Sequence, residues 1–352
     1  MPPPKGALTV ALARVDAEGR EVAWLSGRQG PDGLPVSDSR LRMRVASVTK
    51  MALARTVLAA GLDPETPVSD YLDWPGAAPA IGALMSHISG LSDEAGYIVA
   101  PPESPEAFVA RHPKTRSGPP GFFRYSNLGY LVLACALERA TGRRLDHLMR
   151  EHVLDPAGIG GGLNWSGVAD RDRHLPLWQW QQGRHVCTID GADTDWAAEV
   201  VWRNGQGVPL SDWQPGHAAW FSPQGGLRVS VLELARLVRF CTSGEIGTRM
   251  MAPRWRFDGS NGMDGGGLFR AVGLGMTLYE DHPEIPSHLA GHAGHALGVS
   301  TGAWLDRTTG TAWAYAINGW PDLTEGLDDE VFYPPAEAAI LRAFGSGSLA
   351  RT

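Results

Sequence analysis

Strand-like segments occupy both ends of this 352-residue chain, whereas helical patterns fill its middle. Near the N-terminus, the apolar runs Ala7–Val15 and Glu21–Ser26 are separated by the turn residues Asp16–Gly19, which predicts a β-hairpin. Strand-like runs return towards the other end at residues 272–279, 299–305 and 311–317. This arrangement predicts an α/β fold in which one sheet is built from both chain ends.

Helical patterns lie between these strand-like segments. The stretch Val48–Ala60 is rich in Ala, Leu and Met and ends at a glycine, and Asn127–Ala140 begins with Asn127 as the expected N-cap. Further helices are predicted from Pro105, over Leu145–Leu154, from Val231 behind a capping box to a stop at Gly244, and over Ala336–Phe344. We expect residues 62–227 to form a mainly helical subdomain, inserted in a sheet subdomain of residues 1–61 and 228–352.

Residues 158–226 follow no regular pattern and are rich in tryptophan. The tryptophans are Trp165, Trp178, Trp180, Trp196, Trp202, Trp213 and Trp220. We expect a wall built from loops, which would influence the choice of substrate. Packing of a core is the simpler explanation for the tryptophans.

A hydroxyl and an ammonium group lie one helical turn apart in Ser47-Val48-Thr49-Lys50, where a helix is expected to begin. A serine hydroxyl becomes a strong nucleophile only when a base takes its proton, and a desolvated lysine can serve as that base. The spacing therefore indicates covalent catalysis, although Ser-x-x-Lys alone is a weak signal in a chain of this length.

Two later motifs offer partners for Ser47. Tyr125-Ser126-Asn127 stands where a loop meets a helix, so its phenol can transfer protons if the lysine charge lowers its pKa, and its amide can bind a substrate. His292-Ala293-Gly294 precedes a predicted strand, and its glycine permits close approach of a substrate to the backbone. The N–H groups of Ser47 and His295 would then stabilise an oxyanion.

Together the three motifs resemble the signature motifs of the class C β-lactamase-like serine hydrolases. This superfamily includes penicillin-binding proteins, DD-peptidases, D-aminopeptidases and esterases; the related class A enzymes carry Ser-Asp-Asn where Tyr-x-Asn stands here. The likeness extends to Leu84–Leu91, Phe123–Tyr130 and Pro223–Leu227, and so covers most of the chain from Arg42 to Leu305. It implies an antiparallel sheet flanked by helices, with the active site between the sheet and the inserted subdomain, in one catalytic domain.

The resemblance implies a role for each motif. Ser47 would form an acyl-enzyme, and Lys50 and Tyr125 would share the proton transfers. Asn127, His292 and Gly294 would bind the substrate, and the backbone N–H groups of Ser47 and His295 would form the oxyanion hole. His292 departs from the lysine of the family's β-lactamases and penicillin-binding proteins, and a neutral imidazole holds a carboxylate less firmly.

Three further patterns in the sequence resemble other functional sites. Gly298–Gly302 matches the Gly-x-Ser-x-Gly nucleophile elbow, but no histidine follows Ser300. His288, His292 and His295 could bind zinc, yet the glycines among them disfavour the helix that such spacing needs. The Gly259–Gly267 loop lacks the Gly-Lys-Ser/Thr ending of a phosphate loop. We therefore expect neither a metal nor a cofactor.

The composition of the chain limits the classes of binding partner that we expect. The net charge is −7 with no basic run, which argues against nucleic acid, and no apolar run is long enough to span a bilayer. Met1–Gly6 lacks the apolar core of a signal peptide, and the three cysteines form no Cys-x-x-Cys pair. We expect a cytoplasmic protein, or a periplasmic one if an export signal is missing; its oligomeric state is left open.

These observations predict a serine hydrolase that cleaves a small ester or amide. The alternatives are a DD-peptidase or D-aminopeptidase, a β-lactamase, and a catalytically silent member of the family that only binds ligands. Intact Ser47, Lys50 and Tyr125 argue against the silent alternative.

Overall fold

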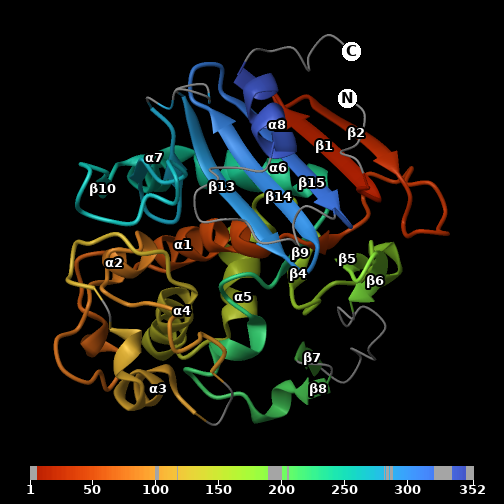
Figure 1. Ribbon diagram of the computed structural model, residues 1–352. Coiled ribbons are helices and arrows are strands. Elements are labelled where there is room, and N and C mark those ends of the chain that lie inside the picture. Colours follow the sequence, from red (N-terminus) through yellow and green to blue (C-terminus); the bar gives the residue numbers. More distant parts are fainter. Residues whose placement is uncertain are drawn as a thin grey trace.

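An eight-stranded antiparallel sheet forms the centre of the computed structural model (Figure 1). The structure describes residues 6–99, 103–116, 118–188, 200–203, 206–280, 282, 285, 288–320 and 335–345. In spatial order the strands are β10 Trp255–Arg256, β11 Ala271–Val272, β12 Thr277–Leu278, β13 Leu289–Ala296, β14 Val299–Asp306, β15 Thr311–Asn318, β1 Thr9–Val15 and β2 Glu21–Gly27. In Figure 1 the red strands β1 and β2 lie beside the blue β15, so the predicted sheet from both chain ends is confirmed.

Helices and smaller sheets surround this sheet. The helices are α1 Thr49–Ala59, α2 Ile81–Met85, α3 Pro105–Arg111, α4 Asn127–Thr141, α5 Leu145–Met149, α6 Val231–Cys241, α7 Gly244–Met251 and α8 Pro335–Gly345. Short helical segments are η1 Ala46–Val48, η2 Val68–Asp70, η3 Pro113–Thr115, η4 Arg150–Leu154, η5 Arg171–Arg173, η7 Leu210–Asp212 and η8 Ala218–Phe221. Strands β3 Met43–Arg44, β9 Leu227–Val229 and β4 Gly162–Leu163 form a small second sheet. None of the described helices combines the length and apolar character needed to cross a membrane.

The central sheet carries a different core on each face, because successive side chains of a strand point to opposite sides. Along β1, Ala11 and Ala13 join the larger core, which includes the apolar face of α6. Val10 and Leu12 join a second core with Leu341 of α8. The small alanines let α6 pack closely, and the larger side chains fill the space beneath α8.

Most predicted helices are confirmed, with differences at their ends. The N-cap of α4 is Ser126 and not Asn127: its hydroxyl accepts the N–H of Gly129 at 3.0 Å. The capping box of Ser230 and Glu233 at the start of α6 is confirmed. That helix already ends at Cys241, and Gly244, predicted as a stop, begins α7.

The tryptophan-rich section differs more from its prediction. Loops were expected, yet the section contains two hairpins: β5 Leu177–Gln181 with β6 Arg184–Thr188, and β7 Val200–Arg203 with β8 Gln206–Pro209. Residues 182 and 183 between β5 and β6 both have positive φ, which is the two-residue turn that favours a hairpin. Trp196 lies outside the described residues.

The strand prediction near the C-terminal end was wrong at two places. The expected strand over residues 272–279 is two short strands, β11 and β12, separated by a turn. The segment with His292, expected before a strand, is itself the eight-residue strand β13. Its sequence Leu-Ala-Gly-His-Ala-Gly-His-Ala contains no β-branched residue, so strand propensity gave no signal.

Candidate active site

Ser47 lies in a strained turn between β3 and α1. The residue before it, Ala46, has a φ of 48°, a conformation that costs energy for any residue other than glycine. Two hydroxyls hold this turn: Thr301 donates to the carbonyl of Val45 at 2.8 Å, and Thr49 donates to the carbonyl of Ala46 at 2.7 Å. Ser47 itself is half-buried, so its hydroxyl is presented by a fixed backbone at a partly open position.

Lys50 lies one turn further along and is completely buried. Its Nζ lies 3.0 Å from Ser47 Oγ, 2.8 Å from Asn127 Oδ1 and 2.9 Å from the carbonyl of Gln224. Burial lowers the pKa of Lys50 to about 7; Asp93 opposes this shift and Arg44 adds to it. At neutral pH a large share of the amine is therefore uncharged and can accept the proton of Ser47.

Tyr125 contacts both the Ser47 hydroxyl and the Lys50 amine. Its side chain is hydrogen-bonded to that of Ser47, and its ring centroid lies 4.9 Å from Lys50 Nζ. The ring stacks on His87 at 4.2 Å, and burial raises the pKa of the phenol far above its ordinary value. The condition of a lowered pKa is therefore not met: the Tyr125 phenol stays protonated at neutral pH and can donate its proton, whereas the neutral amine of Lys50 can accept one.

Asp93 organises the second motif and escaped the sequence analysis. Its carboxylate accepts the N–H groups of Asn127 at 2.9 Å and Leu128 at 3.0 Å, at the positive end of α4. It also accepts the hydroxyl of Ser126 at 3.1 Å and the side-chain amide of Asn127 at 2.9 Å. Because the side-chain amide nitrogen of Asn127 is held by Asp93, its Oδ1 is turned towards Lys50, whose Nζ it accepts at 2.8 Å.

The third motif lies on β13, with His292 and Gly294 on the face towards α1. Burial lowers the pKa of His292 to about 3, and the Lys50 charge adds to the effect. The ring is therefore neutral; its Nδ1 lies against the carbonyl of Ala293 and carries the proton, which leaves Nε2 as an acceptor. His295, an odd number of residues away, points to the opposite face, so these two histidines cannot share a metal ion.

Gly294 has a different neighbour from the one expected. A Cβ at this position would lie 2.6 Å from the Val45 carbonyl oxygen and 2.8 Å from the Ser47 nitrogen. The missing side chain therefore makes room for the turn of residues 46–48 that carries Ser47, where a substrate had been expected.

The register of β13 shows where the N–H of His295 points. Arg307 donates to the carbonyl of His288, and this pairing makes the even residues of β13 bond to β14. The odd residues face the other edge, where β12 pairs only as far as Gly291. The N–H of His295 thus points out of the edge that lies against η1, the segment that contains Ser47. This orientation suits the predicted pair of oxyanion donors, which stays a prediction.

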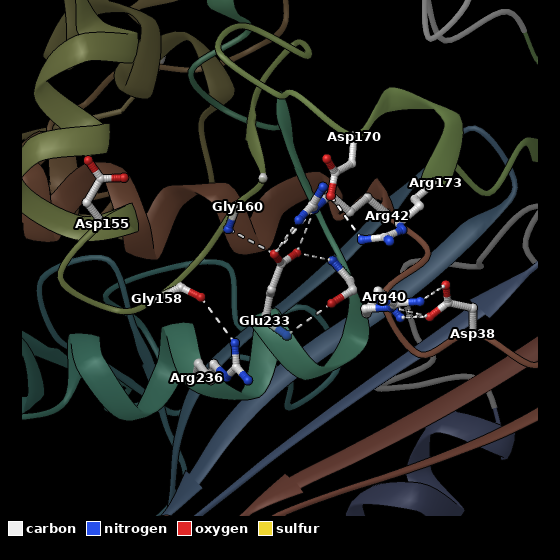
Figure 2. A network of polar contacts seen from close by, with 12 residues as sticks. Asp38, Arg40, Arg42, Asp155, Gly158, Gly160, Asp170, Arg173, Glu233 and Arg236 are labelled. Atoms are coloured by element: carbon white, nitrogen blue, oxygen red, sulfur yellow. Dashed lines mark hydrogen bonds and ion pairs between the residues drawn. The ribbon is translucent and has the colours of Figure 1, made fainter.

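A buried ion pair braces the strand that leads to Ser47. Figure 2 shows Arg42 and Glu233 facing each other, with Nη2 and Oε1 at 2.9 Å and both side chains 9% exposed. The same carboxylate accepts the N–H groups of Gly160 and Ser230. Glu233 thus connects the residue before β3, the start of α6 and the loop after η4, close to the turn that carries Ser47.

A family model and a curated relative match the sequence. The family model described as Beta-lactamase matches residues 7–333. A D-aminopeptidase of Brucella anthropi is 28% identical over 131 residues, a match that covers 34% of this chain and 25% of that protein.

Solved structures show the same fold at low identity. D-amino acid amidase from Ochrobactrum anthropi SV3, complexed with L-phenylalanine amide, superimposes with a TM-score of 0.71 at 20% identity, covering 99% of this chain and 95% of that one. A β-lactamase/D-alanine carboxypeptidase from Yersinia pestis gives 0.67 at 19% identity, covering 97% and 93%. The octameric penicillin-binding protein homologue from Pyrococcus abyssi gives 0.66 at 19% identity, covering 98% and 74%. The predicted fold is therefore confirmed.

Proposed function

The chain belongs to the beta-lactamase family, and on this premise we propose that it is a serine hydrolase that cleaves a small amide or ester through an acyl-enzyme on Ser47. One observation carries the proposal. Ser47 Oγ lies 3.0 Å from the Nζ of a completely buried Lys50, whose pKa is lowered to about 7. A nucleophile and a base matched to neutral pH are thus in contact.

Acylation follows from these positions. The neutral amine of Lys50 takes the Ser47 proton while Oγ forms a bond to the substrate carbonyl carbon. The carbonyl oxygen becomes an oxyanion, which faces the N–H groups of Ser47 and His295. When the carbon–nitrogen or carbon–oxygen bond breaks, Lys50 returns the proton through the Tyr125 phenol to the leaving amine or alcohol.

Deacylation uses the same groups in reverse. A water molecule attacks the ester carbonyl and gives a proton to Lys50, directly or through Tyr125. The bond between Ser47 Oγ and the acyl carbon then breaks, the new bond to the water oxygen remains, and Oγ recovers the proton from Lys50. The balance is substrate plus water giving a carboxylic acid and an amine or alcohol.

Two features favour substrates without a carboxylate beside the scissile bond. His292 is neutral, so no cation of the third motif is available to bind one. The names of the relatives, D-aminopeptidase and D-amino acid amidase, also point to amides whose acyl part is an amino acid. D-amino-acid amides and small esters are therefore the first substrates to try.

Intact-mass spectrometry tests the proposal. The protein is mixed with a panel of esters, D-amino-acid amides and β-lactams, and we expect an adduct of acyl mass that disappears in Ser47→Ala. Hydrolysis of a chromogenic ester is followed in parallel. If Ser47→Ala hydrolyses the ester as fast as the wild type, the assignment of the nucleophile is wrong.

A β-lactamase or DD-peptidase is the second candidate, favoured by the family match and the Yersinia pestis neighbour. With no turnover of D-amino-acid amides, stable labelling of Ser47 by a fluorescent penicillin would favour the DD-peptidase, and hydrolysis of the penicillin would favour the β-lactamase. A silent ligand-binding protein would instead resist a fluorophosphonate probe altogether.

A further inference from the structure

A buried polar cluster on the far face of β13 connects the site to the C-terminal helix. The carboxylate of Glu337, in α8, is completely buried. Its Oε2 lies 2.7 Å from His295 Nε2, and its Oε1 accepts the hydroxyl of Tyr315 on β15 at 2.5 Å. Both carboxylate oxygens are thus used, one by a side chain of β13 and the other by a side chain of β15.

This cluster lies in an apolar environment. The core between α8 and the sheet contains Trp304, Ile317 and Leu341 among other buried apolar side chains. A buried carboxylate costs free energy unless it is well paired, and apolar residues of similar size would stabilise α8 at least as well. Packing alone therefore does not account for Glu337, and the specific geometry that it imposes on His295 is the feature to explain.

The part of β13 that holds His295 needs such an anchor. Among the described residues, the segment from His292 to Ala296 pairs only with β14, because β12 ends opposite Gly291. Its other edge carries the N–H of His295, which points towards the turn that carries Ser47. A strand edge without a partner strand moves more easily, whereas an oxyanion donor must keep its position to within a fraction of an ångström.

We infer that His295 is a positioning residue: its side chain, held by Glu337 of α8, fixes the N–H of its own backbone in the oxyanion hole. This inference rests on the proposed acyl-enzyme function and extends it. It makes α8 part of the machinery that stabilises the transition state, although α8 lies on the face of the sheet opposite to α6 (Figure 1).

Kinetics of matched variants test the inference. His295→Ala, Glu337→Ala and the double variant remove the contact; His295→Gln keeps a donor at the position of Nε2. Leu341→Ala loosens α8 in the same core without touching the contact. For each protein, kcat and KM are measured on a 4-nitrophenyl ester, together with the rate of fluorophosphonate labelling and the melting temperature.

We expect both single alanine variants to lose about tenfold in kcat and in labelling rate, less than the loss of an oxyanion donor costs, with KM nearly unchanged. The double variant should lose no more than either single one, because both break the same contact. His295→Gln should recover most of the rate. Leu341→Ala should lower the melting temperature and leave kcat unchanged.

Three results would overturn the inference. The first is a His295→Ala variant with the kcat of the wild type, while Ser47→Ala is inactive; this leaves the proposed function standing. The second is a Leu341→Ala variant that loses as much kcat as Glu337→Ala. The third is a wild type that neither hydrolyses the ester nor takes up the probe, which overturns the proposed function as well. Should Glu337→Ala fail to fold, Glu337→Gln preserves the shape and replaces it.

Discussion

Two histidines three residues apart on β13 have opposite protonation behaviour. Burial disfavours the imidazolium at both positions. At His292, on the face towards α1, the charge of Lys50 adds to this effect and the pKa falls to about 3. At His295, on the face towards α8, the Glu337 carboxylate outweighs burial and the pKa is raised. The two faces of β13 therefore differ: one favours a neutral imidazole, and the other favours an imidazolium paired with a carboxylate.

The difference shows how this fold creates reactivity. On the face towards α1, burial is only partly offset by Asp93, and Lys50 therefore titrates near neutral pH. On the face towards α8, the Glu337 carboxylate stabilises the imidazolium of His295, and this contact fixes the position of the His295 side chain. A buried ionisable group such as Lys50, whose charge is only partly compensated, can thus serve as a base in the proposed mechanism. A group such as His295, which is directly paired with a carboxylate, instead holds a fixed position.

The largest expected effect comes from abolishing the neutral base. Lys50→Arg keeps a cation that does not deprotonate at neutral pH, and Lys50→Met keeps an uncharged chain without a base. Both should lower ester hydrolysis and fluorophosphonate labelling by about 10³-fold. Exposed Lys114→Met is the control and should match the wild type. Substantial activity in Lys50→Arg would show that Lys50 acts as a fixed charge. The proposed difference between the two faces of β13, a base on one and a fixed ion pair on the other, would then be wrong.

The pH dependence of the wild type should show the next largest effect. In the proposed mechanism the neutral form of Lys50 is the base, so kcat/KM should rise as the pH increases through about 7, by nearly tenfold per unit below that value. The His292 ring, with a pKa of about 3, is already neutral throughout this range.

His292→Asn identifies the group behind this titration. The midpoint near 7 should stay in place in this variant, whatever its absolute rate. A rising limb that vanishes in His292→Asn would assign the titration to His292 and reverse the roles given to the two groups.

Asp93 tests how complete the counter-charge of Lys50 is. Asp93→Asn removes a charge that raises the pKa of Lys50, so the midpoint of the pH profile should move to lower pH. It also weakens the bonds to the start of α4 and should cost about 1–3 kcal/mol of unfolding free energy in urea. Asp70→Asn, at an exposed carboxylate, is the control for both measurements. An unchanged midpoint would mean that Asp93 acts only as a cap.

The sequence could predict what depends on short spacing. Ser47 and Lys50 meet because three residues make nearly one helical turn, and the hairpin of β1 and β2 follows from two apolar runs and a turn. The contacts of Asp93 with Asn127 and of Glu337 with His295 span 34 and 42 residues. No local pattern indicates such contacts, so neither acidic residue could be found in advance.

The misassigned strand has the same cause. β13 consists of Leu, Ala, Gly and His, and it is a strand because β14 pairs with its whole length. Its glycines, which were expected to disfavour a helix, are needed for close approach: Gly294 makes room for the Ser47 turn. Tertiary contacts therefore decided the conformation of the segment that carries the third motif, and with it the opposite directions of His292 and His295.

The smallest expected effect concerns stability on the side of α8. The raised pKa of His295 means that its pairing with Glu337 contributes fully below the unfolded pKa of about 6.5 and is lost as the pH rises through the folded value. Since the His295 side chain is 30% exposed, we expect a loss below about 1 kcal/mol. Urea denaturation of the wild type and His295→Gln at pH 6 and pH 9 measures it. The wild type should lose more stability than the variant over this interval. An equal loss in both would show that the contact holds His295 as a neutral donor, so that the two faces of β13 would differ in geometry but not in charge.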